Sequence, residues 1–194
     1  MRSRANSAET SIDTATSLEL LLNDRWTEYL QSCAENLPGD EKYGVEMKLY
    51  AAVRRLNESV HEGTVAEAII EIGSNLMACE QMAILVTGRQ KKKDPLAQSV
   101  GLTEQVQERL RSTATELAQA IPEGEPYVKG ETKTAHPLLI SLGITAAVPL
   151  CQNKKLKGAI LFFDFLPQRN GLDAGDRALL KLLTVYAGPC LLNC

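Results

Sequence analysis

The chain has 194 residues, 44% of them hydrophobic, and a formal net charge of -3. That length suffices for one domain with its own core and a helical extension. No apolar run reaches the roughly 18 residues that a membrane helix needs, and the N-terminus lacks the apolar segment of a signal peptide. The sequence therefore predicts a soluble, cytoplasmic protein without a membrane partner.

The first third of the chain is expected to contain a leader and a helical extension. Residues 1–15 are rich in Ser, Ala, Thr and Arg without apolar periodicity, which predicts a disordered leader. Residues 16–62 predict two amphipathic helices, separated by Pro38-Gly39. The first begins at the capping sequence Thr16-Ser17-Leu18-Glu19, and the second runs from Glu41 to about His61.

The middle of the chain alternates between helical and strand-like patterns. Thr64-Val65-Ala66-Glu67 has the form of a capping box and predicts the start of a third helix. A nearly unbroken apolar run from Gln81 to Thr87 predicts a central strand. Leu96–Leu102 predicts a second strand, followed by a helix that Thr103 caps, and residues 126–128 predict a third, short strand.

The last third predicts a hairpin and a closing helix. Ile144–Leu150 and Lys157–Phe165 are apolar runs rich in β-branched or aromatic residues, and residues 152–155 between them supply turn chemistry. Asp173 stands at the expected N-cap of the final helix, where its carboxylate can accept a bond from the amide three residues on. The apolar stripe of this helix consists of Leu179, Leu180, Leu183, Tyr186, Ala187 and Cys190.

The order of these features resembles the C-terminal half of a GAF domain. The shared features are a strand ending in Val-Pro-Leu, a turn, a strand led by Gly158, a loop, the Leu-x-x-x-Asp of residues 172–176, and a closing helix with Leu-Leu. The resemblance extends over residues 63–194 and is strongest in the last third. It implies an α+β fold in which helices flank a central antiparallel sheet, here preceded by the two amphipathic helices.

In the resembled family, the variable segment before the hairpin folds over one face of the sheet and closes a ligand pocket. Strand alternation together with this segment gives seven candidate ligand-binding residues. Tyr127, His136 and Thr145 would orient a ligand, and the other four would shape the cavity. Each of the seven is also consistent with ordinary core packing. The candidates are Thr87, Tyr127, His136, Leu139, Thr145, Ala147 and Phe163.

Two specific branches of the GAF family match this sequence poorly. The cyclic-nucleotide class resembles this chain only at Asp176, because Asp164-Phe165 stands where that class has Asn-Lys. A bilin-binding domain would need a cysteine near His136, and Ala135 precedes it. His136 also lacks a partner at metal-ligand spacing, so the sequence requires no metal or other cofactor.

An enzymatic function is not expected. The branch that reduces free methionine sulfoxide depends on cysteines in the loop segment, and no cysteine lies between Cys79 and Cys151. Nothing nearby would lower the pKa of either thiol. The five cysteines show no Cys-x-x-Cys pair, which argues against a disulfide framework or a zinc site. They are Cys33, Cys79, Cys151, Cys190 and Cys194.

The sequence thus predicts a non-catalytic sensory module that binds a small molecule and signals by association. The alternatives are an interaction protein whose pocket its own side chains fill, and a thiol-dependent reductase. We expect a homodimer and a separate signalling partner. The basic run at residues 89–93 is interpreted as a solvated loop, because the chain is acidic overall, and nucleic acid is not expected. The expected dimer contacts are Leu22, Trp26, Tyr29, Tyr43 and Tyr50.

Overall fold

The computed structural model describes residues 38–59, 62–87, 94–122, 124–133, 135–152, 155–168 and 171–192. The chain divides into two compact units, residues 1–46 and 47–194. Several predictions lie outside the described residues: the leader, the first helix with Leu22, Trp26, Tyr29 and Cys33, the basic run at 89–93, the tip of the hairpin at 153–154, and His61 and Cys194.

Among the residues that the structure describes, two helices precede the sheet, and both begin earlier than predicted. Helix α2 spans Gly39–Asn57 and helix α3 spans Glu62–Leu76. At the start of α2, the carbonyl of Pro38 accepts the N–H of Lys42 at 2.8 Å, and acidic residues follow at the positive helix end. Thr64 lies inside α3, so the capping box predicted there is wrong.

The sheet has five strands in the order β2-β1-β5-β4-β3, and every neighbouring pair is antiparallel. The predicted hairpin is confirmed, because β4 pairs along its length with β5. The central strand β5 pairs with β1 on its other side. The strands are β1 Cys79–Val86, β2 Leu96–Val100, β3 Tyr127–Val128, β4 Ala146–Gln152 and β5 Lys155–Phe165.

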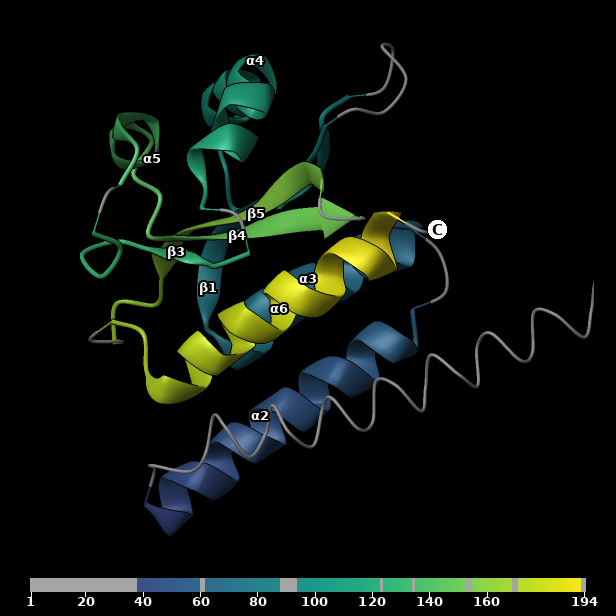
Figure 1. Ribbon diagram of the computed structural model, residues 1–194, viewed down its shortest axis with the longest axis vertical. Coiled ribbons are helices and arrows are strands. Elements are labelled where there is room, and N and C mark those ends of the chain that lie inside the picture. The colour runs from purple at the N-terminus through teal and green to yellow at the C-terminus, as the bar shows by residue number, and fades with distance from the viewer. Residues whose placement is uncertain are drawn as a thin grey trace, which may run out of the picture. The chain divides into compact units, whose positions relative to one another are not determined.

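Helices cover both faces of the sheet. Figure 1 shows α4 (Glu104–Ala120) and α5 (Pro137–Ser141) on one face, and α3 and α6 (Ala174–Leu192) on the other. Because both faces are covered, the central strands are apolar on both sides, which explains the unbroken apolar runs of the sequence. Helix α5 was not predicted, since five residues are too few for helical periodicity to appear.

The face of the sheet beneath α4 and α5 holds one continuous group of buried apolar side chains, here called the α4-face cluster. It draws on all five strands, on both helices and on the segments beside them. None of its members is more than 9% exposed. The cluster consists of Ala83, Leu85, Leu96, Leu110, Ala114, Leu117, Ile121, Tyr127, Leu139, Ile144, Ala147, Ala159, Leu161 and Phe163.

The opposite face packs against α3. Gly73 of α3 lies so close to Met82 and Phe162 that an added Cβ would press on both side chains. Strand alternation therefore sends Met82 and Phe162 to this face, while Ala83 and Phe163 belong to the α4-face cluster. Within the described part of the chain, no helix combines the length and apolar character that crossing a bilayer requires.

Candidate functional site

Four of the seven predicted ligand-binding residues meet in the α4-face cluster. Tyr127 comes from β3, Ala147 from β4, Phe163 from β5 and Leu139 from α5. Tyr127 and Ala147 are direct partners across the β3–β4 ladder. These four side chains are therefore brought together on the face of the sheet where the resemblance places a ligand.

Tyr127 carries the polar atom that distinguishes this cluster. Its side chain is 1% exposed, and its hydroxyl has no hydrogen-bond partner among the described residues. Burial also raises the pKa of the Tyr127 phenol, so the hydroxyl keeps its proton at neutral pH. A buried hydroxyl without a partner costs roughly 1–3 kcal/mol. A bound molecule that supplied the missing hydrogen bond would remove that cost.

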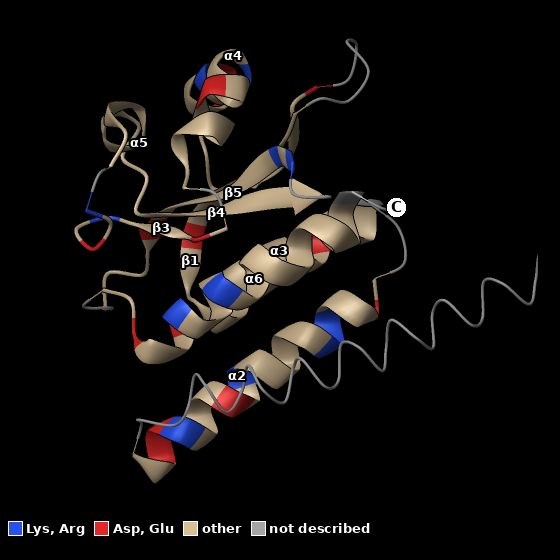
Figure 2. Cartoon of the chain, viewed as in Figure 1, with Lys and Arg blue, Asp and Glu red and all other residues tan. Residues whose placement is uncertain are grey.

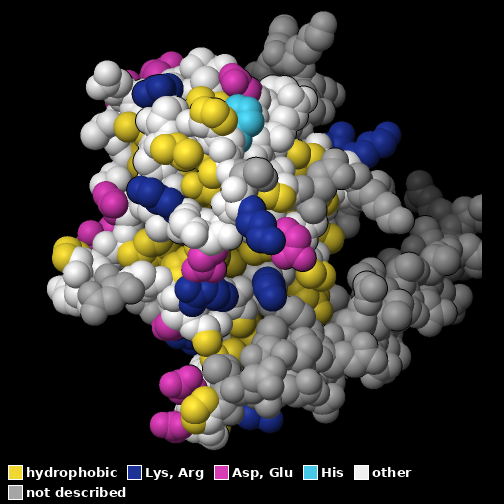
Figure 3. All heavy atoms as spheres, turned by 60° about the vertical axis from the view of Figure 1, so that its left-hand side comes forward, with side chains coloured by type: hydrophobic (Ala, Val, Ile, Leu, Met, Phe, Trp, Pro, Cys, Tyr) yellow, Lys and Arg dark blue, Asp and Glu magenta, His cyan; other side chains and the backbone are white. Residues whose placement is uncertain are grey.

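The other predicted polar residues are engaged with the backbone. The Thr145 hydroxyl donates to the carbonyl of Phe163 at 2.5 Å. Nδ1 of His136 accepts the N–H of Leu138 at 3.3 Å, which caps α5, and His136 is exposed. Figure 3 shows a histidine side chain (cyan) at the surface. Thr87 lies half-buried just after β1 and is not a member of the α4-face cluster.

Helix α4 supplies most of the cover over the cluster. Its Leu110, Ala114 and Leu117 are buried at helical spacing, which gives the helix one apolar face. The predicted cap is confirmed, because the Thr103 side chain accepts the N–H of Val106. Arg111 ties the outer side of α4 to Asp94, beside β2, at 2.9 Å.

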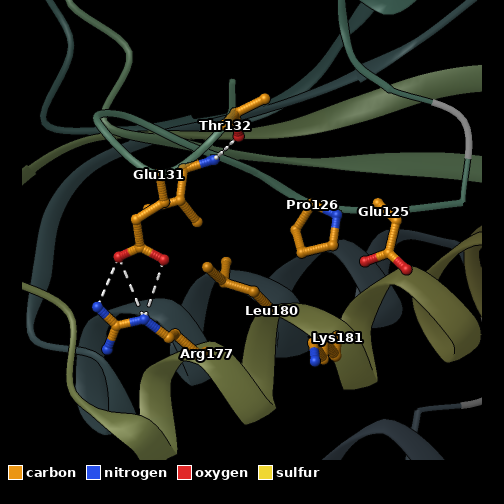
Figure 4. A pocket seen from close by; sticks show the side chains of 8 residues that line it. Glu125, Pro126, Glu131, Thr132, Arg177, Leu180 and Lys181 are labelled. Atoms are coloured by element: carbon orange, nitrogen blue, oxygen red, sulfur yellow. Dashed lines mark hydrogen bonds and ion pairs between the residues drawn. The ribbon is translucent and has the colours of Figure 1, made fainter. Parts of the chain in front are cut away.

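A second, charged hollow lies on the α6 side of the sheet and was not predicted. It measures about 290 Å³ and is lined by the segment around β3 and by α6 (Figure 4). Arg177 pairs with both carboxylate oxygens of Glu131 and donates to the carbonyl of Leu172. The hydrogen bonds from this guanidinium hold the pKa of Glu131 below its usual value. No sequence signal links residues that lie 46 positions apart.

Strand β3 separates the two regions. Its two residues point to opposite faces, as neighbouring strand residues do, so Tyr127 belongs to the α4-face cluster whereas Val128 lines the charged hollow. The hollow is open to solvent, and its principal charges, Glu131 and Arg177, already neutralise each other. The buried cluster with its unpartnered hydroxyl is therefore the stronger candidate site.

The sulfur of Cys79 lies in an environment that suppresses reactivity. The side chain is buried, and Sγ lies 3.3 Å from the carbonyl oxygens of Gln81 and Asp164. Burial raises the pKa of this thiol to about 11, so it stays protonated at neutral pH. Across the described ranges, no group of three or more His, Cys, Asp or Glu side chains is arranged to hold a metal ion.

The burial of the Cys79 thiol predicts that it reacts slowly with alkylating reagents. We expect the thiol to react with iodoacetamide at pH 7.5 at least roughly 100-fold more slowly than a free cysteine, and to react fully once the protein is unfolded in urea. Mass spectrometry of tryptic peptides at timed intervals measures the rate. The half-buried Cys151 serves as the internal comparison. Fast labelling of Cys79 in the folded protein would contradict this description of its surroundings.

Comparison with solved structures places this arrangement among GAF domains. The GAF domain of an Acinetobacter phosphoenolpyruvate-protein phosphotransferase superposes with a TM-score of 0.50 at 13% identity, over 77% of this chain and 93% of that one. The GAF domain/HD domain protein from Geobacter sulfurreducens gives a TM-score of 0.49 at 16% identity, over 72% and 97%. No protein-family model and no curated protein sequence matches the chain.

The chain therefore has the fold of a GAF domain, as its sequence pattern indicated. It consists of a five-stranded antiparallel sheet with helices on both faces, preceded by α2. At such low identity the likeness establishes the fold alone, and the function has to be argued from the residues of this chain.

Proposed function

We propose that this protein is a cytoplasmic, non-catalytic sensory or regulatory module that binds a small, mostly apolar molecule on the α4 face of its sheet. The observation that carries the proposal is the buried Tyr127 hydroxyl without a partner. Ligand pockets are mostly apolar with a few polar groups that fix orientation, and this cluster has that composition. The ligand would present one hydrogen-bonding group to Tyr127 and apolar surface to Leu139 and Phe163.

Entry of a ligand requires that part of the cover moves. Helix α5 is the weakest part of that cover, because it has only five residues and carries Ile140, which is 56% exposed. Its start depends on an exposed cap from His136 at 3.3 Å. We propose that displacement of α5 opens the cluster, and that the change reaches a separate signalling protein or a second copy of this chain through altered association.

Replacement of Tyr127 by phenylalanine tests this proposal. We expect a ligand that copurifies with the wild-type protein to be lost, or its affinity to fall at least roughly tenfold, since one hydrogen bond to a buried hydroxyl is worth about 1.4 kcal/mol. The ligand-free protein should be equally stable or more stable, because the substitution removes an unsatisfied polar atom. Native mass spectrometry and urea unfolding measure the two effects.

A matched control distinguishes loss of the buried hydroxyl from loss of a tyrosine hydroxyl at the surface. Tyr43→Phe removes the same hydroxyl from a side chain that is 65% exposed, so ligand content and stability should both stay unchanged. A bare apo mass for the wild-type protein would count against the ligand-binding proposal, whatever the stability of Tyr127→Phe.

That outcome would favour a second candidate function, an interaction protein whose pocket is filled by its own side chains. The observation in its favour is that Tyr127, Leu139, Ala147 and Phe163 already pack in one continuous cluster. In that case the protein would act through its surfaces alone.

We also propose that the protein does not catalyse thiol chemistry of the methionine sulfoxide reductase type. The support for this is the raised pKa of Cys79, which leaves little thiolate at neutral pH. Serine substitution of the five cysteines, one at a time, under a sulfoxide-reduction assay tests it. Activity that one substitution abolishes would overturn the non-catalytic assignment.

A further inference from the structure

One face of α2 is exposed and apolar through the middle of the helix. Tyr43, Met47 and Tyr50 are 65%, 49% and 59% exposed, and they are three of the six large hydrophobic side chains that stand out on the described part of the chain. Spacings of four and three residues place them on one side of a single continuous helix. This face, which also includes the exposed Asp40, Gly44, Ala51 and Arg54, is here called the α2 stripe.

The α2 stripe is complementary to itself when a second copy runs in the opposite direction. With the two antiparallel helices crossing at Met47, a residue before Met47 in one copy faces the residue equally far after it in the other, so Gly44 faces Tyr50. In the same way, Tyr43 faces Ala51. Each large ring of one copy therefore faces a small residue of the other, which lets the helices approach closely. Open space surrounds Gly44 on its own protomer, since an added Cβ would meet nothing within 4 Å.

The charges of the helix favour the same direction. The first turn of α2 carries Asp40 and Glu41, and the last turn carries Arg54 and Arg55 (Figure 2). An antiparallel pair places Asp40 opposite Arg54, whereas a parallel pair would set like charges together. Arg54 already pairs with Glu58 of its own helix at 2.9 Å, and its remaining N–H groups can take a second carboxylate.

We propose that the α2 stripe is a homodimer contact, in which α2 of one copy packs antiparallel against α2 of a second copy about a two-fold axis at Met47. The proposal deepens the proposed signalling by association and needs no ligand. Tyr43 and Tyr50, two of the predicted dimer contacts, become the aromatic anchors of this interface. One helix pair buries less than a standard interface of about 1,600 Å², so the dimer is reversible, with a Kd on the order of micromolar.

Gly44→Leu in the full-length chain is the first test. The leucine has room on its own protomer and suits a helix better than glycine, so the fold and the thermal midpoint should be retained. It fills the space that Tyr50 of the second copy would occupy, and we expect dimerisation to weaken roughly 100-fold. Sedimentation equilibrium measures the change. Gly63→Leu, an exposed glycine of α3 with equally open surroundings, is the matched control and should dimerise normally.

A charge exchange tests the direction of packing. Asp40→Arg alone and Arg54→Asp alone should each weaken the dimer about tenfold, because each sets like charges opposite one another. The double variant should recover wild-type affinity only if residue 40 faces residue 54 of the other copy. A parallel dimer would gain nothing from the second substitution, so absence of recovery would overturn the proposal.

Two further outcomes would also overturn it. A monomeric wild-type chain at 100 μM would mean that the α2 stripe is not a homodimer contact, and that another segment or partner covers it. A dimer that tolerates Gly44→Leu would use a different surface. In the ligand-free protein, Tyr127→Phe should leave dimerisation unchanged, so failure of the dimer proposal and failure of the ligand proposal are separately visible.

Discussion

Replacement of Gly158 by alanine is expected to lower the free energy of unfolding by about 3 kcal/mol or more. A Cβ at this position would overlap the carbonyl oxygen of Leu85 in β1 and press on the Cα of Val86. Both obstacles are backbone atoms in the centre of the sheet. Strand β5 cannot shift away from β1 to relieve the overlap, because it is also paired with β4, where Gly158 faces Leu150.

Urea unfolding followed by circular dichroism measures the effect. Gly63→Ala is the control, since the added methyl group meets nothing within 4 Å, and its midpoint should stay the same or rise slightly. Equal midpoints for Gly158→Ala and the wild type would contradict the close approach of β1 and β5. The same close approach explains why a glycine stands in the middle of an otherwise bulky apolar strand.

Replacement of Lys48 by methionine is expected to destabilise the protein by about 2–3 kcal/mol. Asp176 is the one charged side chain in the described residues that is completely buried. The Lys48 ammonium lies 3.3 Å from Asp176 and 3.1 Å from Asp173. Asp176 also accepts the N–H of Asp173 at 2.9 Å, but without the ammonium its buried charge has less compensation. Methionine keeps most of the aliphatic stem, so the change in packing is small.

The double variant Lys48→Met with Asp176→Asn isolates the charge. It should recover part of the lost stability, because the asparagine is neutral and can still accept the backbone N–H of Asp173. Lys129→Met replaces an exposed lysine and serves as the control, with an expected change within about 0.5 kcal/mol. A Lys48→Met variant as stable as this control would show that the ammonium contributes little to holding Asp176.

The elements that could be predicted from the sequence are those that depend on residues close together in the chain. Thr103 and Asp173 were recognised as caps, and both side chains accept the expected backbone N–H, at 3.5 Å and 2.7 Å. These bonds join residues three apart, so the chain positions alone bring the partners together. The strands of the hairpin were recognised in the same way, since their apolar runs and the short turn lie in one continuous segment.

The errors have a common origin in weak local signals. Thr64 resembles a cap, but α3 already begins at Glu62, so a capping pattern inside a helix was mistaken for its start. Helix α5 has only five residues, too few to show a period of 3.6, and its start depends on Pro137 and on the side chain of His136. The first error concerns an element end, where the energy differences between alternatives are small. The second concerns a whole helix that is too short to leave a periodic pattern.

The strands, the three longer helices around the sheet and the two caps could be predicted from the sequence, because they depend on apolar periodicity and on neighbours within a few positions. Strand alternation, together with the variable segment before the hairpin, also indicated Tyr127, Leu139, Ala147 and Phe163. Three features depend on the packing of distant elements: these four side chains meet in one cluster, the Tyr127 hydroxyl has no partner there, and Lys48 compensates Asp176 from 128 positions away. Such long-range pairings arise from how the elements pack, and no local pattern encodes them.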